Sequence, residues 1–126
     1  MNDAGPTGAA DVRGGAGPVT GALAGMRIVD LTTVIMGPLA TRQLGDHGAE
    51  VIRIETLDGD TTRNSPPSRH AGMSATTMNL HRNKRSVALD LKHPDGLRAA
   101  RAVVASADAV VTNMRRGALE IGRAHV

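Results

Sequence analysis

The sequence predicts an α/β fold with a mostly parallel sheet, for two reasons. First, short apolar runs at residues 27–31, 51–55 and 108–113, together with an alternating segment at residues 86–92, are typical of buried strands. Second, segments with helical periodicity separate these runs, so that strand and helix alternate along the chain. This alternation is typical of βαβ units, whose strands are parallel and whose helices cover the sheet.

The first expected unit runs from residue 27 to residue 55. Pro38 suits the first turn of a helix, because its missing N–H would have no partner there and its φ is already helical. Gly48 supplies a stop for the same helix. We therefore expect a strand at 27–31, a helix between Pro38 and Gly48, and a second strand at 51–55.

Residues 81–92 combine positive charge with alternation. A cationic turn at residues 81–85 leads into the segment 86–92, in which Val87, Leu89 and Leu91 fall on one side. Period-2 alternation predicts a strand. A basic turn, followed by a strand whose carboxyl end opens onto a helix, is suited to hold a phosphorylated ligand.

The remaining segments complete the expected organisation. Residues 1–24 are rich in Gly, Ala and Pro, and we expect a disordered leader with order beginning at Gly25. Residues 57–78 carry many Asp, Gly, Pro, Ser and Thr residues, which predicts a long loop. A helix is expected after Pro94, followed by the fourth strand at 108–113.

The composition limits the class of protein. The 126 residues suffice for one small domain or for part of a larger one, and 40% of them are apolar, yet none is aromatic. Any core must therefore consist of aliphatic side chains, which makes it thin. The sequence also has no cysteine, which excludes a disulfide framework, a thiolate metal site and a cysteine nucleophile.

Charge and hydropathy bear on partners and location. The net charge of +3 tolerates anionic ligands but is too small to require nucleic acid. No run approaches the roughly 18 apolar residues of a membrane span, and the first residues lack a signal-peptide pattern, so we expect no membrane association and a cytoplasmic location. The five histidines lack the spacing of metal ligands, so no metal is expected.

Several blocks, read together, resemble the class III coenzyme A transferases, the CaiB/BaiF group, which also contains 2-methylacyl-CoA racemases. They occur in the order of the family and cover about residues 25–120. The most specific block begins with Asn-Lys-Arg-Ser and ends with Leu-Asp-Leu-Lys. The blocks are residues 25–31, 37–41, 44–55, 59–63, 83–92 and 107–113.

The resemblance implies the N-terminal part of a Rossmann-like large domain, incomplete in this chain, from an enzyme of several hundred residues that forms an interlocked homodimer. Such an enzyme transfers CoA from an acyl-CoA to a carboxylic acid, through mixed anhydride and thioester steps on one aspartate that acts as nucleophile. No aspartate of this chain matches that position, so no catalytic residue is assigned. Racemization of a 2-methylacyl-CoA is the alternative within the family, and the residues of the six blocks do not separate the two reactions.

The resemblance also implies a set of contacts to coenzyme A, the only cofactor expected. They lie at or near the carboxyl ends of the expected strands, where ligands dock in open α/β sheets. Lys92 is the expected cation for a phosphate, whereas at Thr56 the basic residue common in the family is absent. The expected contacts are Ile35, Met36, Thr56, Leu89, Asp90, Leu91, Lys92, Asn113, Met114 and Arg115.

Three charged residues have alternative interpretations. Lys84 and Arg85 either neutralise phosphates of CoA or belong to a solvated turn, as short charge runs usually do. Asp30 is a carboxylate inside an apolar strand and needs partners if buried. We expect a structural hydrogen-bonding role for Asp30 and not a catalytic one.

Two alternatives from other classes stay open. One is a small basic module that binds nucleic acid, against which stands the lack of aromatic residues for base stacking. The other is a polypeptide with no function of its own, because a partial sheet has uncovered edges and an isolated 126-residue chain is expected to fold poorly or self-associate. Residues 121–126 leave the family pattern and resemble read-through of a sequencing adapter, so we expect them to be artefactual.

Overall fold

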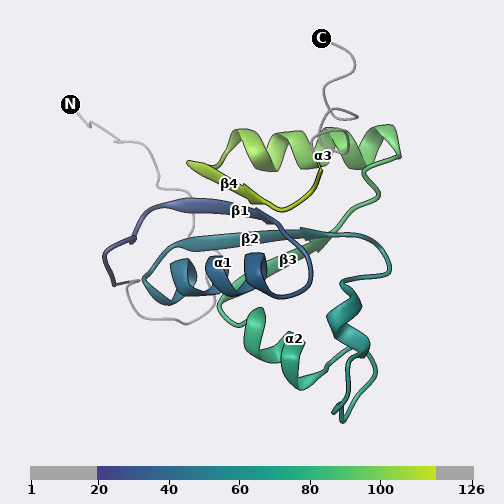
Figure 1. The fold of residues 1–126 in the computed structure, drawn as a ribbon. Helices are drawn as coiled ribbons and strands as arrows, with labels where there is room; N and C mark the ends of the chain where they lie inside the picture. The colour runs from purple at the N-terminus through teal and green to yellow at the C-terminus, as the bar shows by residue number, and fades with distance from the viewer. Residues whose placement is uncertain (1–19, 116–126) are drawn as a thin grey trace, which may run out of the picture.

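The computed structural model describes residues 20–115, which form a four-stranded sheet with helices on both faces (Figure 1). All strand pairs are parallel, and the strand order is β3-β2-β1-β4. The strands are β1 (Arg27–Leu31), β2 (Glu50–Glu55), β3 (Lys84–Ala88) and β4 (Ala109–Thr112). The helices are α1 (Met36–Asp46), the short 3-10 helix η1 (Thr61–Asn64), α2 (Ala75–Leu80) and α3 (Pro94–Ala105). The predicted α/β fold with a parallel sheet is confirmed.

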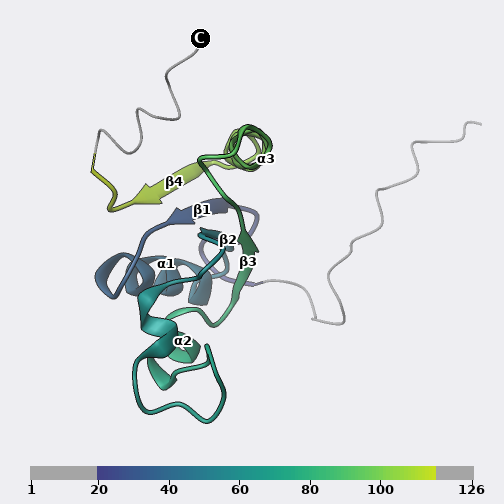
Figure 2. The same ribbon diagram turned by 90° about the vertical axis from the view of Figure 1, so that its right-hand side faces the viewer.

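The two longer helices cover opposite faces of the sheet, which Figure 2 shows nearly edge-on. On the α3 face, Val29, Leu31 and Ile54 of the sheet pack with Ala100 of α3. On the α1 face, a smaller apolar cluster gathers near the amino ends of the strands, and it consists of Ile28, Ala49 and Val51, with Leu23, Leu44 and Val111 packed against it. The core is aliphatic throughout, as the composition requires.

The chain is ordered earlier than expected at its amino-terminal side. Residues 21–25 form a turn, and the backbone N–H of Leu23 donates to the carbonyl of His47 at 3.0 Å. The Leu23 side chain packs against the α1-face cluster. The expectation that disorder extends to Ala24 is therefore wrong for residues 20–24, because Leu23 has a hydrophobic partner. Residues 1–19 lie outside the described part of the chain.

The segment 57–78 is not the structureless loop that its composition predicts. It contains η1 and the first residues of α2, each capped by a side chain. Asp60 accepts from the N–H of Thr62 at 2.8 Å, and Ser74 accepts from the N–H of Thr77 at 3.0 Å. Because Ser and Asp are also common loop residues, their capping role was hidden in a stretch rich in both.

Strand β3 begins and ends earlier than the alternation predicts. It starts at Lys84, so part of the expected cationic turn lies within the strand. This position tolerates a cation because the Lys84 ammonium lies 2.9 Å from the carboxylate of Asp30. The expected continuation at residues 89–92 forms a turn instead, in which Asp90 accepts from the N–H of Lys92 at 2.9 Å. The predicted alternation itself holds, because all three aliphatic side chains, Val87, Leu89 and Leu91, pack against the α3-face core.

The helices are short. α1 begins at Met36, two residues before the expected start at Pro38, and it ends at Asp46, two residues before the expected stop at Gly48. α3 begins at Pro94, as expected, with Asp95 in its first turn, where a negative charge is favourable. Within residues 20–115, no helix combines the length and apolar character that crossing a membrane requires.

Candidate functional site

The candidate site is a small open hollow at the carboxyl edge of the sheet. It lies where β1 and β2 end and where the segments that follow β3 and β4 approach them, which is the usual position of ligands in parallel α/β sheets. The apolar residues that line it are Leu31, Ile54, Leu91 and Met114. The remaining lining residues are more polar, and they are Thr33, Arg53, Glu55, Thr56, Gly59 and Asp60.

The structure brings three of the expected contact residues together in this hollow. Thr56 follows β2, Leu91 follows β3 and Met114 follows β4, so that three separate segments of the chain supply them. Leu89 does not line the hollow but supports it, because its N–H donates to the carbonyl of Glu55 at 2.9 Å. Asp90 fixes the turn that carries Leu91 through its bond to the N–H of Lys92.

The other expected contacts lie outside the lining of the hollow. Ile35 and Met36 stand at the start of α1, with exposed fractions of 49% and 77%. Such exposed aliphatic side chains are available for an apolar ligand. Lys92 and Arg115 are exposed as well, in the segments that follow β3 and β4.

The side chain of Asn113 is bound to another loop. Its amide oxygen accepts from the N–H of Thr33, and its amide nitrogen donates to the carbonyl of Thr33, both at 3.0 Å. This reciprocal pair joins the segment after β4 to the segment after β1. The residue expected to contact the ligand is thus engaged in holding two edge loops together.

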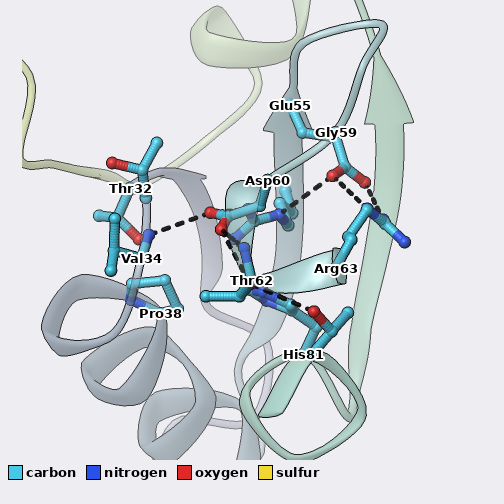
Figure 3. A network of polar contacts seen from close by, with 12 residues as sticks. Thr32, Val34, Pro38, Glu55, Gly59, Asp60, Thr62, Arg63 and His81 are labelled. Carbon is cyan, nitrogen blue, oxygen red and sulfur yellow. Dashed lines mark hydrogen bonds and ion pairs between the residues drawn. The ribbon is translucent and has the colours of Figure 1, made fainter. Parts of the chain in front are cut away.

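A buried charge network lies on the α1 face of the sheet, and two of its members, Arg53 and Asp60, also line the hollow. It consists of Asp30, Arg53, Asp60 and Lys84, whose side chains are 2% exposed or less. Arg53 Nη2 lies 2.8 Å from Asp60 Oδ2, and Lys84 Nζ lies 2.9 Å from Asp30 Oδ2. Arg53 Nη1 links the two pairs, at 3.8 Å from Asp30. Figure 3 shows Asp60 lying between Val34 on one side and the Glu55–Arg63 pair on the other.

The buried carboxylates are held in their ionised form. Burial would raise the pKa of Asp60, but hydrogen bonds from the N–H and hydroxyl of Thr62, from the N–H of Val34 and from Arg53 bring it down to about 2. Burial of Asp30 is likewise outweighed by hydrogen bonds from Thr32, Lys84 and Thr41, so its pKa is also lowered. Both carboxylates therefore keep their charge and their hydrogen-bond acceptors at neutral pH.

A neutral histidine, His81, contacts both cations of the network. Burial, together with the charges of Arg53 and Lys84, lowers the pKa of His81 to about 4. Its ring Nδ1 then accepts from Arg53 Nη1 at 3.1 Å and from Lys84 Nζ at 3.4 Å. Burial also lowers the pKa of Lys84, against the opposing effect of Asp30.

The structure shows the surroundings of the three charged residues that have alternative interpretations. Lys84 is neither in a solvated turn nor able to reach a ligand, because its side chain is 1% exposed and bonded to Asp30, Thr41 and the carbonyl of Pro38. Arg85 is exposed and pairs with Glu50 at the amino end of β2. Asp30 accepts hydrogen bonds from its neighbours, consistent with the structural role expected for it.

Sequence reasoning missed Arg53 and Asp60 as organisers of the site. A charged residue inside an apolar run was the available signal for Arg53, as it was for Asp30. Asp60 offered no such signal, because it lies among loop-type residues. Within the described residues, no three His, Asp or Glu side chains are placed to hold a metal ion.

The fold is a parallel α/β domain with a small hollow at the carboxyl edge of its sheet. Comparison with known proteins gives the family: the model of CoA-transferase family III matches residues 23–123. The chain belongs to CoA-transferase family III.

Named relatives and solved structures agree with this assignment. The chain is 39% identical over 99 residues to the succinyl-CoA–L-malate CoA-transferase beta subunit of Chloroflexus aurantiacus, a match that covers 78% of this chain and 24% of that protein. It is 43% identical over 98 residues to the succinyl-CoA:glutarate CoA-transferase of Mus musculus, covering 77% of this chain and 22% of that protein. The crystal structure of a CaiB/BaiF family protein from Brucella suis superposes with a TM-score of 0.77 at 32% identity, over 85% of this chain and 29% of that one. The chain thus spans about a quarter of the length of these relatives.

Proposed function

We propose that this chain supplies the coenzyme A-binding N-terminal portion of an enzyme that transfers CoA from an acyl-CoA to a carboxylic acid. The observation that carries the proposal is the hollow at the carboxyl edge, where three residues expected to contact CoA, Thr56, Leu91 and Met114, converge from separate segments. The relatives named above are transferases, which favours transfer over racemization.

The chemistry of the hollow supports an uncharged part of CoA as its occupant. Its aliphatic lining suits the adenine ring or the pantetheine arm, because apolar surface is removed from water on binding. The charged groups at its rim are already paired, since Asp60 binds Arg53 and Glu55 binds Arg63. The phosphates then lie outside the hollow, toward the exposed cations Lys92 and Arg115.

The remaining parts of the proposal concern the whole enzyme. The aspartate nucleophile lies beyond the matched part of this chain, the large domain is Rossmann-like, and the enzyme is an interlocked homodimer in the cytoplasm. Family membership and the partial coverage of the relatives support this view. In the described residues, most arginines pair with carboxylates, as in Arg27–Glu50, Arg53–Asp60 and Arg82–Asp46, which leaves little free positive charge for a nucleic acid.

A binding experiment tests the role of the hollow. In the complete polypeptide that carries these residues, Met114→Asp places a charge in the aliphatic lining, and we expect CoA to bind at least about tenfold more weakly by titration calorimetry, because a charge in an apolar contact is costly. Met78→Asp is the matched control, since Met78 lies on α2 and is 59% exposed. Equal affinity of the Met114→Asp variant and the unsubstituted protein would contradict the assignment.

An activity measurement tests the reaction. The complete polypeptide should move CoA from succinyl-CoA to an added dicarboxylic acid, which liquid chromatography detects as a new acyl-CoA. Residues 1–126 alone should show weak CoA binding at most and no transfer. Transfer by the 126-residue chain alone would overturn the proposal that its nucleophile lies elsewhere.

A further inference from the structure

The turn between β1 and α1, residues 32–35, is held by side chains from three different segments. The N–H of Thr32 donates to Asp30 at 2.9 Å, and the N–H of Thr33 donates to Asn113 at 3.0 Å. The N–H of Val34 donates to Asp60 at 3.0 Å. Three successive backbone donors are therefore bound by acceptors on β1, after β4 and after β2.

Val34 has a backbone conformation that valine rarely adopts. Its φ is +70°, in the left-handed region that favours glycine. A β-branched residue is a clear outlier there, and such a conformation costs about 1–3 kcal/mol unless its surroundings impose it. Asn83, with φ of +62°, needs no such explanation, because asparagine tolerates this region. The strain at Val34 must be offset by the contacts of the turn.

Asp60 is the contact best suited to offset this strain. Its Oδ2 accepts from the N–H of Val34 itself and, at 2.8 Å, from Arg53 Nη2. Its Oδ1 accepts from the N–H and the hydroxyl of Thr62, both at 2.8 Å. Arg53 and Thr62 thus fix the carboxylate that binds Val34, and Asp60 is only 5% exposed. A rigid, ionised acceptor binds a backbone N–H more strongly than a mobile or neutral one.

The strained residue directly precedes two residues expected to contact CoA. Ile35 and Met36 follow Val34, and both present exposed aliphatic side chains at the start of α1. The direction in which these side chains leave the turn depends on the backbone at Val34. A turn that relaxed to an ordinary φ would move both of them relative to the hollow.

We propose that Asp60 is a positioning residue, which holds Val34 in its left-handed conformation and so presents Ile35 and Met36 to coenzyme A. This inference rests on the proposed function, since it takes CoA to be the ligand of these side chains. Asp60 itself need not touch the ligand. Its loss lowers the fraction of molecules with a competent turn, and the apparent affinity for CoA falls by that fraction.

The test uses the complete polypeptide and compares Asp60→Ala with Thr62→Ala. Asp60→Ala removes both the cap of η1 and the acceptor of the Val34 N–H, whereas Thr62→Ala removes only the hydroxyl that donates to Asp60 Oδ1. We expect Asp60→Ala to weaken CoA binding about tenfold, a change that corresponds to the strain of one unsupported residue. Thr62→Ala should weaken CoA binding much less than Asp60→Ala, because the Thr62 N–H and Arg53 still hold the Asp60 carboxylate.

Substitutions at Val34 separate positioning from general destabilisation. In the Asp60→Ala background, Val34→Gly should restore most of the lost affinity, because glycine adopts a positive φ without strain. Val34→Ala removes the two γ-methyl groups but retains the Cβ that causes the strain, and it should restore little. Equal affinities of the two double variants, or undiminished CoA binding by Asp60→Ala, would overturn the proposal.

Hydrogen exchange at the Val34 amide tests, without any ligand, whether Asp60 holds this N–H in the folded protein. In the unsubstituted protein this amide should exchange far more slowly than in an unstructured peptide, and the protection should be lost in Asp60→Ala but largely kept in Thr62→Ala, where the acceptor is still present. Free exchange in the unsubstituted protein would overturn the proposal even if Asp60→Ala failed to fold. Should the unsubstituted protein bind no CoA, the proposed function fails, while exchange at Val34 still decides whether Asp60 holds the turn.

Discussion

The face of the sheet under α3 is packed with aliphatic side chains, whereas the face under α1 holds the buried charge network. Val29, Leu31 and Ile54 point toward α3. One residue away on the same strands, Asp30 and Arg53 point toward α1, as the alternation of strand side chains requires. The sheet therefore uses two kinds of packing on adjacent residues.

The difference between the faces has a consequence for function. Aliphatic contacts stabilise without direction, so the α3 face holds the fold together but leaves its loops unspecified. Hydrogen bonds and ion pairs have direction, and those of the α1 face reach the edge loops, because Asp30 and Asp60 accept from Thr32 and Val34. We infer that the α3 face contributes packing without direction, whereas the geometry of the site comes mainly from the α1 face.

The largest effect is expected from removing the central cation of the network. Arg53→Met leaves Asp60 without its guanidinium and Asp30 with Lys84 alone, and we expect a loss of about 4 kcal/mol in the free energy of unfolding, because a buried charge loses its partner. Arg85→Met is the control, since this side chain is 74% exposed and should cost about 1 kcal/mol or less. Urea denaturation of the complete polypeptide measures both. Similar losses for the two variants would show that the network is not essential for stability.

The α3 face should respond by a different mechanism. Val29→Ala leaves a cavity beside Ile54 and Ala100, and we expect a loss of about 2 kcal/mol in the free energy of unfolding. Val29 does not line the hollow, and unlike Arg53→Met this variant should leave the turn at Val34 intact, so CoA affinity should not change in the folded protein. Val110→Ala is the control, because Val110 is 42% exposed. A CoA affinity that fell as much in Val29→Ala as in Arg53→Met would contradict the division between the faces.

As the pH falls, the free energy of unfolding should decrease first because of His81, which contacts the charge network of the α1 face. The pKa of His81 is about 4 in the folded protein against an ordinary value of 6.5, because burial and two neighbouring cations disfavour its charge. The unfolded chain therefore takes up the proton first as pH falls, so stability is full above pH 6.5 and declines from there to about pH 4. The shift corresponds to about 3 kcal/mol in full, and because His81 is partly exposed we expect a loss of about 2 kcal/mol over this window, measured by urea denaturation at each pH.

His81→Gln is the matching variant, because its amide oxygen can still accept from Arg53 and Lys84 but does not titrate. Its stability should be flat between about pH 6.5 and pH 4.5. A second decline, from about pH 4.5 toward 2, should remain in the variant, because it reflects Asp60 and Glu55, whose pKa values are lowered to about 2. A variant that kept the earlier decline would assign it to another group.

The smallest effect compares one glycine on each side of the sheet. A Cβ at Gly96 in α3 would lie 2.1 Å from the carbonyl oxygen of Asp90, so Gly96→Ala should displace the turn at residues 89–92 and cost about 1.5 kcal/mol. A Cβ at Gly45 in α1 would meet Val51 at 3.4 Å, which is an ordinary contact. Gly45→Ala should therefore increase the free energy of unfolding by about 0.5 kcal/mol, because alanine favours a helix over glycine. Thermal unfolding compares the two variants, and a stabilising Gly96→Ala would be the contrary result.

The α3 face was largely predictable from the sequence, and the α1 face was not. Alternation placed Val87, Leu89 and Leu91 on one side, and all three pack against the α3-face core. A hydrophobic pattern is local, so it can be read over a few residues. The partners of a buried charge are not local: Asp30 and Lys84 are 54 residues apart, and no spacing rule connects them. That pair also explains why β3 starts earlier than expected.

The candidate site shows the same limit. The residues after each strand could be placed at the carboxyl edge, and Thr56, Leu91 and Met114 do meet there. No local pattern indicated that Asn113 would bind the backbone of Thr33, 80 residues away. Such loop-to-loop contacts depend on the assembled sheet, because strand order brings β4 beside β1.

The most direct test is a crystal structure of the complete polypeptide with coenzyme A bound. We expect an uncharged part of CoA in the hollow, in contact with Thr56, Leu91 and Met114, with Val34 still at a positive φ and bonded to Asp60. CoA bound elsewhere on the protein, with the hollow empty, would contradict the proposed site.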